Sequence, residues 1–346
     1  MLLLVATCLA AAARAADPDG AEMEFLWQVN RARSDPAAWG LENGLGSLLD
    51  AFAARPPLAW NPTLVASAQA KAQEFVDLGY FAHQSPVTGT PNALIAVVHG
   101  YPLSGGSSTG YFYFGPGCDF GCSYAPNVGN SAVESLASSF AVDGGLTNTP
   151  IGAVRGLLGE ICTAAGTPNT CGTDGHRRHL LAAATLPAPM VESGAGHTVE
   201  VEGALTTHYW VFHTGFPASS PATMPQFLTG VVYADADFDG HYDAGEGIGG
   251  VTVQANALAA VTNGAGGWSI AVPNGSYDVG CAGGTFTGTA TASGVVVADA
   301  NREVDCVSGE PHAIVDFAPE PVALASGAAA LGALGALGLM TRSRRS

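Results

Sequence analysis

The stretch LVASAQAKAQEFVDLGYFAHQS, residues 64–85, has the pattern of an amphipathic helix that ends close to a histidine. Its apolar residues recur at helical spacing, so one face is expected to be buried. Asn61 and Pro62 suit the N-cap and the first helical position. Gly79 suits the C-terminal end, because glycine adopts the left-handed conformation at little steric cost. The stretch therefore predicts a rigid helix that positions His83.

The neighbouring segments predict further helices and then strands. Asp35-Pro36 indicates a helix stop or a fresh helix start. Residues 130–137 (NSAVESLA) are expected to begin a helix, with Glu134 near its first turn. Residues 151–162 (IGAVRGLLGEIC) predict another helix that carries Glu160. Residues 193–201 and 207–213 alternate in polarity, as expected of two β-strands joined by a short loop.

The composition of the chain limits which classes of function are expected. The chain has 346 residues, enough for two domains, and a formal net charge of -17. Only 12 residues are Lys or Arg, against 29 Asp and Glu. Nucleic-acid binding requires clustered basic residues, so it is not expected. An acidic surface instead favours a cation such as Ca²⁺.

Both ends of the chain predict export. Residues 1–15 form an apolar run with a small-x-small cleavage pattern at Ala13-Arg14-Ala15, which indicates a signal peptide. Residues 318–346 contain Pro-Glu-Pro, an uncharged apolar stretch and an arginine-rich end. This tail is long enough to cross a bilayer as a transmembrane helix. It also resembles the PEP-CTERM sorting signal of Gram-negative bacteria, which implies a cell-surface or extracellular location. A plain membrane anchor is the alternative.

The cysteines predict disulfides. Cys8 lies in the expected signal peptide, which leaves an even number, as is typical of an exported protein. Six cysteines allow fifteen connectivities. The neighbours in sequence suggest the pairs Cys118–Cys122, Cys162–Cys171 and Cys281–Cys306.

A Pro/Ser-rich linker, residues 217–227, separates two regions of different composition. Residues 228–317 contain short strand patterns separated by Gly, Asn and Pro, which predict an all-β sandwich. Within this region, DADFDGHYDAGE has acidic residues at the spacing of a twelve-residue calcium loop, with glycine at its sixth position. The expected Ca²⁺ ligands are Asp235, Asp237, Asp239, the carbonyl of His241, Asp243 and Glu246. The strand-like flanks resemble SdrD B-like (Cna B-like) surface repeats, which implies a structural role for Ca²⁺.

Several motifs in the first region occur in an order typical of one family. They are FLWQVNRARSDPAAWG, LAWNPTLVASAQAKAQEFVDLGYFAHQS, SAVESLAS, GHRRHLLA, VESGAGHT and HYWVFHTG. In these motifs and their order, residues 20–216 resemble the CAP superfamily (SCP domains) in its bacterial form. The resemblance implies an α+β chain: a CAP α-β-α sandwich followed by the all-β sandwich.

The same resemblance implies a cleft of two histidines and two acids, which binds a divalent metal in some members. His83 matches the first histidine, Glu134 the first acid and His176 the second histidine. Glu160 is the candidate for the second acid, and Glu192 is the alternative. Imidazoles and carboxylates of this kind are suited to ligate Zn²⁺ or to act as a general acid/base pair.

Three functions remain open from the sequence. The first is a non-enzymatic surface or matrix protein whose cleft binds a ligand or metal, with a glycan, a lipid or a matrix polymer as the partner. The second is a secreted hydrolase that uses His83, Glu134 and His176. The third is an adhesin or carbohydrate-binding protein that acts through residues 228–317. The only membrane contact expected is through the tail before processing.

Overall fold

The computed structural model describes residues 16–103, 111–113, 122–124, 132–141, 149–160, 175–182, 190–217, 225–309 and 313–317. The expected signal peptide and sorting tail lie outside these ranges. So do Cys118, Cys162 and Cys171, and with them two of the predicted disulfides. Within the ranges, no helix is both long and apolar enough to cross a membrane.

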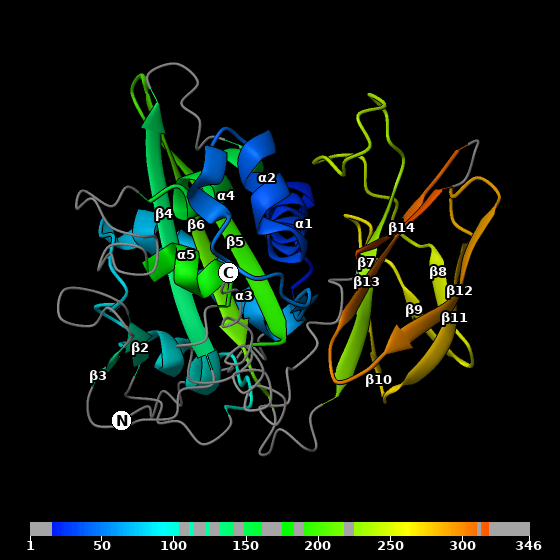
Figure 1. The fold of residues 1–346 in the computed structure, drawn as a ribbon. Coiled ribbons are helices and arrows are strands. Elements are labelled where there is room, and N and C mark those ends of the chain that lie inside the picture. Colours follow the sequence, from blue (N-terminus) through cyan, green and yellow to red (C-terminus); the bar gives the residue numbers. More distant parts are fainter. Residues whose placement is uncertain are drawn as a thin grey trace, which may run out of the picture.

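The first region is built on a four-stranded sheet with the strand order β1-β5-β6-β4 (Figure 1). β6 pairs antiparallel with both β5 and β4, whereas β1 pairs parallel with β5. The β5–β6 hairpin confirms the two strands predicted from alternating polarity. The strands are β1 (Ala59–Trp60), β4 (Ala132–Ala141), β5 (Glu192–Glu202) and β6 (Leu205–Gly215).

Helices cover both faces of this sheet. Neighbouring residues of β6 point to opposite sides, and each side packs against a different helix. Trp210 and Phe212 pack with Phe25 of helix α1 (Gly20–Ser34). Val211, which lies between them, packs with Phe75 of helix α3 (Pro62–Leu78). The layers α3, sheet and α1 form the expected α-β-α sandwich. The remaining helices are α2 (Pro36–Glu42), η1 (Gly46–Leu49), η2 (Ala93–Val98), α4 (Pro150–Leu158) and α5 (Gly175–Leu180), and a separate ribbon pairs β2 (Tyr111–Tyr113) with β3 (Cys122–Tyr124).

Helix α3 begins and ends where its sequence predicts. The side chain of Asn61 accepts hydrogen bonds from the amides of Thr63 and Leu64, and Gly79 is left-handed with φ +64°. The helix packs unusually close to β5. A Cβ on Gly194 or Gly196 would lie 2.2 Å from backbone atoms of α3, so both positions require glycine.

The segment around Glu134 is not the expected helix. Residues 132–141 form strand β4, which pairs with β6 from Ala132↔Gly215 to Ala141↔Thr206. The local composition favours a helix, because Ala, Glu, Leu and Ser are compatible with one. Ten backbone pairings to β6 and burial of Val133 and Leu136 override this local preference.

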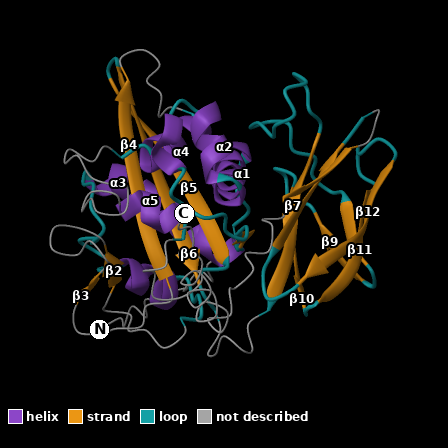
Figure 2. Cartoon of the chain, in the orientation of Figure 1, coloured by secondary structure: helices purple, strands orange, loops and turns teal. Residues whose placement is uncertain are grey.

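The second region is a sandwich of two four-stranded sheets and contains no helix in its described residues (Figure 2). Its core includes Leu228, Trp268 and Val304 from one sheet and Val279 from the other. The predicted Cys281–Cys306 disulfide is present and joins the two sheets. One sheet has the order β10-β7-β13-β14 and the other β12-β11-β8-β9, formed by β7 (Gln226–Tyr233), β8 (Thr252–Ala255), β9 (Leu258–Val261), β10 (Gly267–Val272), β11 (Gly275–Ala282), β12 (Thr289–Val297), β13 (Arg302–Val307) and β14 (Ala313–Phe317).

Helix α1 is a layer shared by both regions. Val231 and Tyr233 of β7 belong to the same core cluster as Trp27 of α1, and Trp27 Nε1 donates to Asp305 Oδ2 of β13 at 2.8 Å. Figure 1 shows the second region alongside α1. The helix is therefore buried on nearly all sides and has no single apolar stripe. The linker pattern alone did not predict this common core.

Candidate functional site

Glu134 and His213 lie directly opposite each other on β4 and β6. Both point to the α3 side of the sheet, as do Leu136 and Val211 two residues away. Glu134 Oε2 and His213 Nε2 are 2.8 Å apart, and the two side chains are 1% and 0% exposed. An acid and a histidine are thus buried in an otherwise apolar layer, which costs stability unless their hydrogen bonds are complete.

His83 completes the hydrogen bonds of Glu134 from the surface. Its Nδ1 lies 2.8 Å from Glu134 Oε1, and its side chain is 40% exposed. Burial alone would raise the pKa of Glu134, but the hydrogen bonds from His213 and His83 outweigh burial and lower that pKa to about 2. Glu134 is therefore a carboxylate that accepts an N–H from each ring.

Lys71 of α3 holds the backbone at His83 in place. Its buried ammonium donates to the carbonyl of His83 at 3.1 Å and to the hydroxyl of Tyr80 at 2.9 Å. Burial is the main cause that lowers the pKa of Lys71. The hydroxyl of Tyr80 donates in turn to Glu74. Ser85 Oγ also donates to Glu74 and accepts the amides of Val87 and Thr88, so its hydrogen bonds hold the loop together.

The second predicted pair, Glu160 and His176, forms at the start of α5. Glu160 Oε1 and His176 Nδ1 are 2.6 Å apart. Glu160 Oε2 also accepts the backbone amides of His176 and Arg177, which anchors the first residues of the helix. Glu160 is thus the acid that accompanies the second histidine.

Glu192, the alternative acid, belongs to a different cluster. Its carboxylate accepts from Asn61 Nδ2 at 2.7 Å and from the hydroxyl of Tyr101 at 2.9 Å. Burial is the main cause that raises its pKa. Asn61 caps α3, so Glu192 supports the N-terminal end of that helix.

His179 of α5 packs against the face of the sheet opposite to Glu134 and His213. It is buried, with Nδ1 2.6 Å from Ser135 Oγ and Nε2 2.7 Å from Thr214 Oγ1. These two residues follow Glu134 and His213 on their strands and point to the opposite face. Burial is the main cause that holds the pKa of His179 well below its usual value. The two pairs therefore lie near the same end of the sheet.

The four residues predicted to line the cleft do not converge on a metal position. Among the described residues, the group whose donor atoms lie within 4.8 Å of one another is Asp235, Asp237 and Asp239, and it includes no cleft residue. Glu134 is instead hydrogen-bonded to His83 and His213, and Glu160 is paired with His176. The geometry thus does not favour the expected zinc site with these four ligands.

The acidic loop brings together three of its predicted side chains. The carboxylates of Asp235, Asp237 and Asp239 converge, and carboxylate oxygens are the donors that Ca²⁺ prefers. Glu246 lies close by, where it accepts the amides of Ala236 and Asp243. The side chain of His241 points toward the first region and is 3.4 Å from Glu42.

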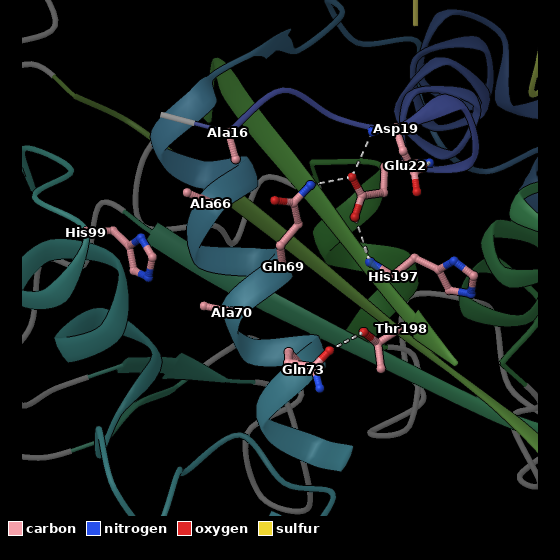
Figure 3. Close-up of a pocket in the computed structure, with 10 residues that line it drawn as sticks. All are labelled: Ala16, Asp19, Glu22, Ala66, Gln69, Ala70, Gln73, His99, His197 and Thr198. Carbon is pink, nitrogen blue, oxygen red and sulfur yellow. Dashed lines mark hydrogen bonds between the residues drawn. The ribbon is translucent and has the colours of Figure 1, made fainter. Parts of the chain in front are cut away.

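A separate pocket of about 560 Å³, which the sequence did not predict, lies between the start of α1, the outer face of α3 and β5 (Figure 3). Its polar groups largely bond to one another: Glu22 accepts from Gln69 and from the amide of His197. The ring of His197 points away from α3 (Figure 3). This ring stacks on Trp210 of β6. The pocket is lined by Ala16, Asp19, Glu22, Ala66, Gln69, Ala70, Gln73, His99, His197 and Thr198.

Comparisons with known proteins add little to this geometry. No protein-family profile matches the chain, and no curated protein does. Among solved structures, the chain is similar to an extracellular protein containing an SCP domain from Bacillus anthracis str. Ames. The identity is 15%, the match covers 55% of this chain and 41% of that chain, and the TM-score is 0.27. The class that the fold and site define is therefore an α-β-α sandwich with paired histidines and acids, joined to a β-sandwich.

Sequence reasoning did not predict the bond of His213 to Glu134 or that of Lys71 to the carbonyl of His83. His213 was visible as a strand histidine, but its partner depends on the register between β4 and β6. Lys71 is the only lysine in the chain. That it lies on the α3 face toward the sheet could have been read from helical spacing with Leu64, Ala68 and Phe75.

Proposed function

We propose that this chain is an exported CAP-type surface or matrix protein whose histidine–acid cleft binds a ligand. The observation that carries the proposal is the buried carboxylate of Glu134, which holds the exposed ring of His83. Burying a carboxylate costs several kcal/mol before its hydrogen bonds compensate, so its burial is weak evidence of a stability role. A buried ionised group that holds an exposed titratable ring is a candidate for function.

Export is part of the proposal and rests on the two ends of the chain. Residues 1–15 would be removed as a signal peptide, and residues 318–346 would direct sorting to the surface of a Gram-negative cell. N-terminal sequencing of the protein recovered from cells tests the first point. A start at Ala16 supports export, whereas a retained Met1 contradicts it.

Calcium in the acidic loop is a further part of the proposal. Three carboxylates converge there, so Ca²⁺ would neutralise a cluster of negative charge and stiffen the loop. Its role would be structural, because the loop lies between strands of the sandwich and next to α1. Zinc in the cleft remains a prediction from the resemblance, and metal analysis of the intact purified chain tests it.

A hydrolase is the second candidate, and the orientation of His83 favours it. Glu134 accepts from Nδ1, which leaves Nε2 of the exposed ring as a base. Ser85 is buried and its hydroxyl oxygen already accepts two backbone amides, so we take water as the attacking group. An adhesin role of the second region is a third candidate without a specific structural observation.

One set of variants separates these candidates. The intact chain and its His83→Ala and His176→Ala variants are tested for binding to a glycan array and to phosphatidylglycerol vesicles. They are also tested for hydrolysis of p-nitrophenyl esters and glycosides. Binding that both variants lose supports a ligand cleft. Hydrolysis that His83→Ala loses supports the enzyme, and glycan binding that neither variant affects supports the adhesin.

A further inference from the structure

A continuous row of hydrogen bonds runs from the interior of the first region to the exposed ring of His83. Ser67 Oγ of α3 is 2.8 Å from His213 Nδ1. His213 Nε2 is 2.8 Å from Glu134 Oε2, and Glu134 Oε1 is 2.8 Å from His83 Nδ1. Two strands, one helix and the loop after that helix each contribute one member.

Only the last member of this row meets solvent. Ser67 and His213 are both 0% exposed, and the side chain of Glu134 is 1% exposed. The interior members therefore cannot exchange their partners for water. Removal of one of them leaves an unpaired polar atom, which costs about 1–3 kcal/mol or forces a rearrangement.

The direction of these hydrogen bonds follows from counting donors. An ionised carboxylate only accepts, so each oxygen of Glu134 needs an N–H. His83 must then carry a proton on Nδ1, and in the neutral ring its Nε2 has a lone pair. His213 must carry a proton on Nε2. Free histidine in water prefers the opposite tautomer, with the proton on Nε2, so His83 is held in its less favoured form.

We infer that His213 is a positioning residue that fixes the tautomer of His83 by occupying the second oxygen of Glu134. This inference rests on the proposed function only in taking His83 as the cleft histidine. His213 touches no ligand itself. It keeps the carboxylate of Glu134 ionised and oriented toward His83. The neutral ring of His83 then presents the lone pair of Nε2 to a ligand, rather than an N–H.

Loss of His213 would change what His83 presents. Without a donor at Oε2, a buried Glu134 is expected to hold a proton or to turn its carboxyl group away from His83. Either change removes the acceptor that fixes the proton on Nδ1. His83 would then revert toward the Nε2–H tautomer and present a donor to the cleft.

The test is ¹⁵N NMR of the full-length chain labelled at histidine. Two-bond ¹H–¹⁵N correlations distinguish the two neutral tautomers, and the His83 signals are assigned by their loss in His83→Gln. The wild type is expected to show His83 with the proton on Nδ1. A wild-type His83 that is predominantly the Nε2–H tautomer overturns the inference without any variant.

Two substitutions at one position refine the test. In His213→Leu the Nδ1–H pattern of His83 is expected to be lost, whereas His213→Gln keeps a side-chain donor and is expected to retain it. His208→Gln, on the same strand but farther along, is the matched control and should leave His83 unchanged. A folded His213→Leu protein with an unchanged His83 pattern contradicts the inference.

This readout is independent of binding and activity. If no ligand or substrate is found but the tautomer depends on residue 213, the proposed function fails and the positioning role stands. If binding depends on His83 but the tautomer of His83 is the same in the His213 variants, the positioning role fails and the proposed function stands. If His213→Leu does not fold, the wild-type tautomer and the His213→Gln spectrum still decide.

Discussion

The indole Nε1 of Trp27 donates a 2.8 Å hydrogen bond to Oδ2 of Asp305, two residues that are 278 positions apart in the chain. Both are buried, and the bond joins α1 of the first region to β13 of the second. The other oxygen of Asp305 accepts the amide of Val231. The two regions are thus joined by interior groups as well as by the connecting chain.

We predict that Trp27→Phe destabilises the junction by about 2–4 kcal/mol, because Asp305 loses a buried donor. Trp39→Phe is a matched control, since Trp39 Nε1 donates to Gln28 within the first region. Urea unfolding followed by circular dichroism measures both variants. The wild type is expected to unfold in one transition, and Trp27→Phe in two. One unbroken transition in both variants would contradict the role of the junction.

The buried acid Glu24 predicts a pH dependence. Burial is the main cause that raises its pKa from 4.5 to about 7 in the folded state. A raised pKa gives stability that is fully present below pH 4.5 and is lost as the pH rises through 7. Glu24→Gln can still accept the Ala244 amide but does not titrate. Between pH 5 and 8, the unfolding free energy of the wild type should therefore fall by roughly 2 kcal/mol more than that of the variant. Equal slopes of unfolding free energy against pH would show that Glu24 is not the titrating group.

Glu134 predicts a dependence of the opposite sign. Its pKa is about 2 in the folded state, below the usual 4.5, so its contribution is present above pH 4.5 and is lost as the pH falls toward 2. Glu134→Gln should therefore reduce the unfolding free energy at pH 7 by about 2–4 kcal/mol. Glu200→Gln, at a partly exposed acid that binds Tyr209, serves as the control and should change it by less than about 0.5 kcal/mol.

The close approach of α3 to β5 predicts a steric effect. In Gly196→Ala the added Cβ would lie 2.2 Å from the carbonyl carbon of Ala68, so the helix must move. We expect a loss of at least about 3 kcal/mol, or failure to fold. Gly264→Ala has open space around its Cβ and should be nearly neutral. Thermal unfolding of both proteins provides the measurement, and a stable Gly196→Ala protein would refute the tight packing.

The acidic loop predicts stabilisation by Ca²⁺. If Ca²⁺ binds only the folded chain, about 2.7 kcal/mol is gained at a hundredfold excess over Kd. Asp237→Asn should lower that gain, because Asp237 is one of the three converging carboxylates. Asp278→Asn changes an acid of the same region outside the loop and should keep it. Calorimetric titration and unfolding with and without EGTA test this, and equal stability in both conditions would count against the site.

Local patterns in the sequence predicted the elements whose ends are set by neighbouring residues. Helix α3 is the clearest case, since Asn61 and Gly79 act within the helix itself. Asp35 behaves similarly, because it ends α1 and caps α2. The β5–β6 hairpin and the Cys281–Cys306 bond were also visible in local order.

Contacts between distant segments were not predictable in this way. Residues 132–141 became a strand only because β6 offers an edge to pair with. The partnership of Glu134 with His213 depends on that register, and the burial of Trp27 depends on strands far along the chain. The resemblance to a family placed His83, Glu134, Glu160 and His176 in one cleft, but it could not supply the hydrogen bonds between them.

The shared position of α1 has a consequence for how the chain reaches its native state. This helix is made early during synthesis, yet its outer surface is covered by strands that extend to Val307. Contacts over such long separations form slowly, and exposed apolar surface promotes aggregation in the meantime. Folding of the first region should therefore remain incomplete until nearly the whole chain has been synthesised. Truncated chains that lack the last strands should be prone to self-association.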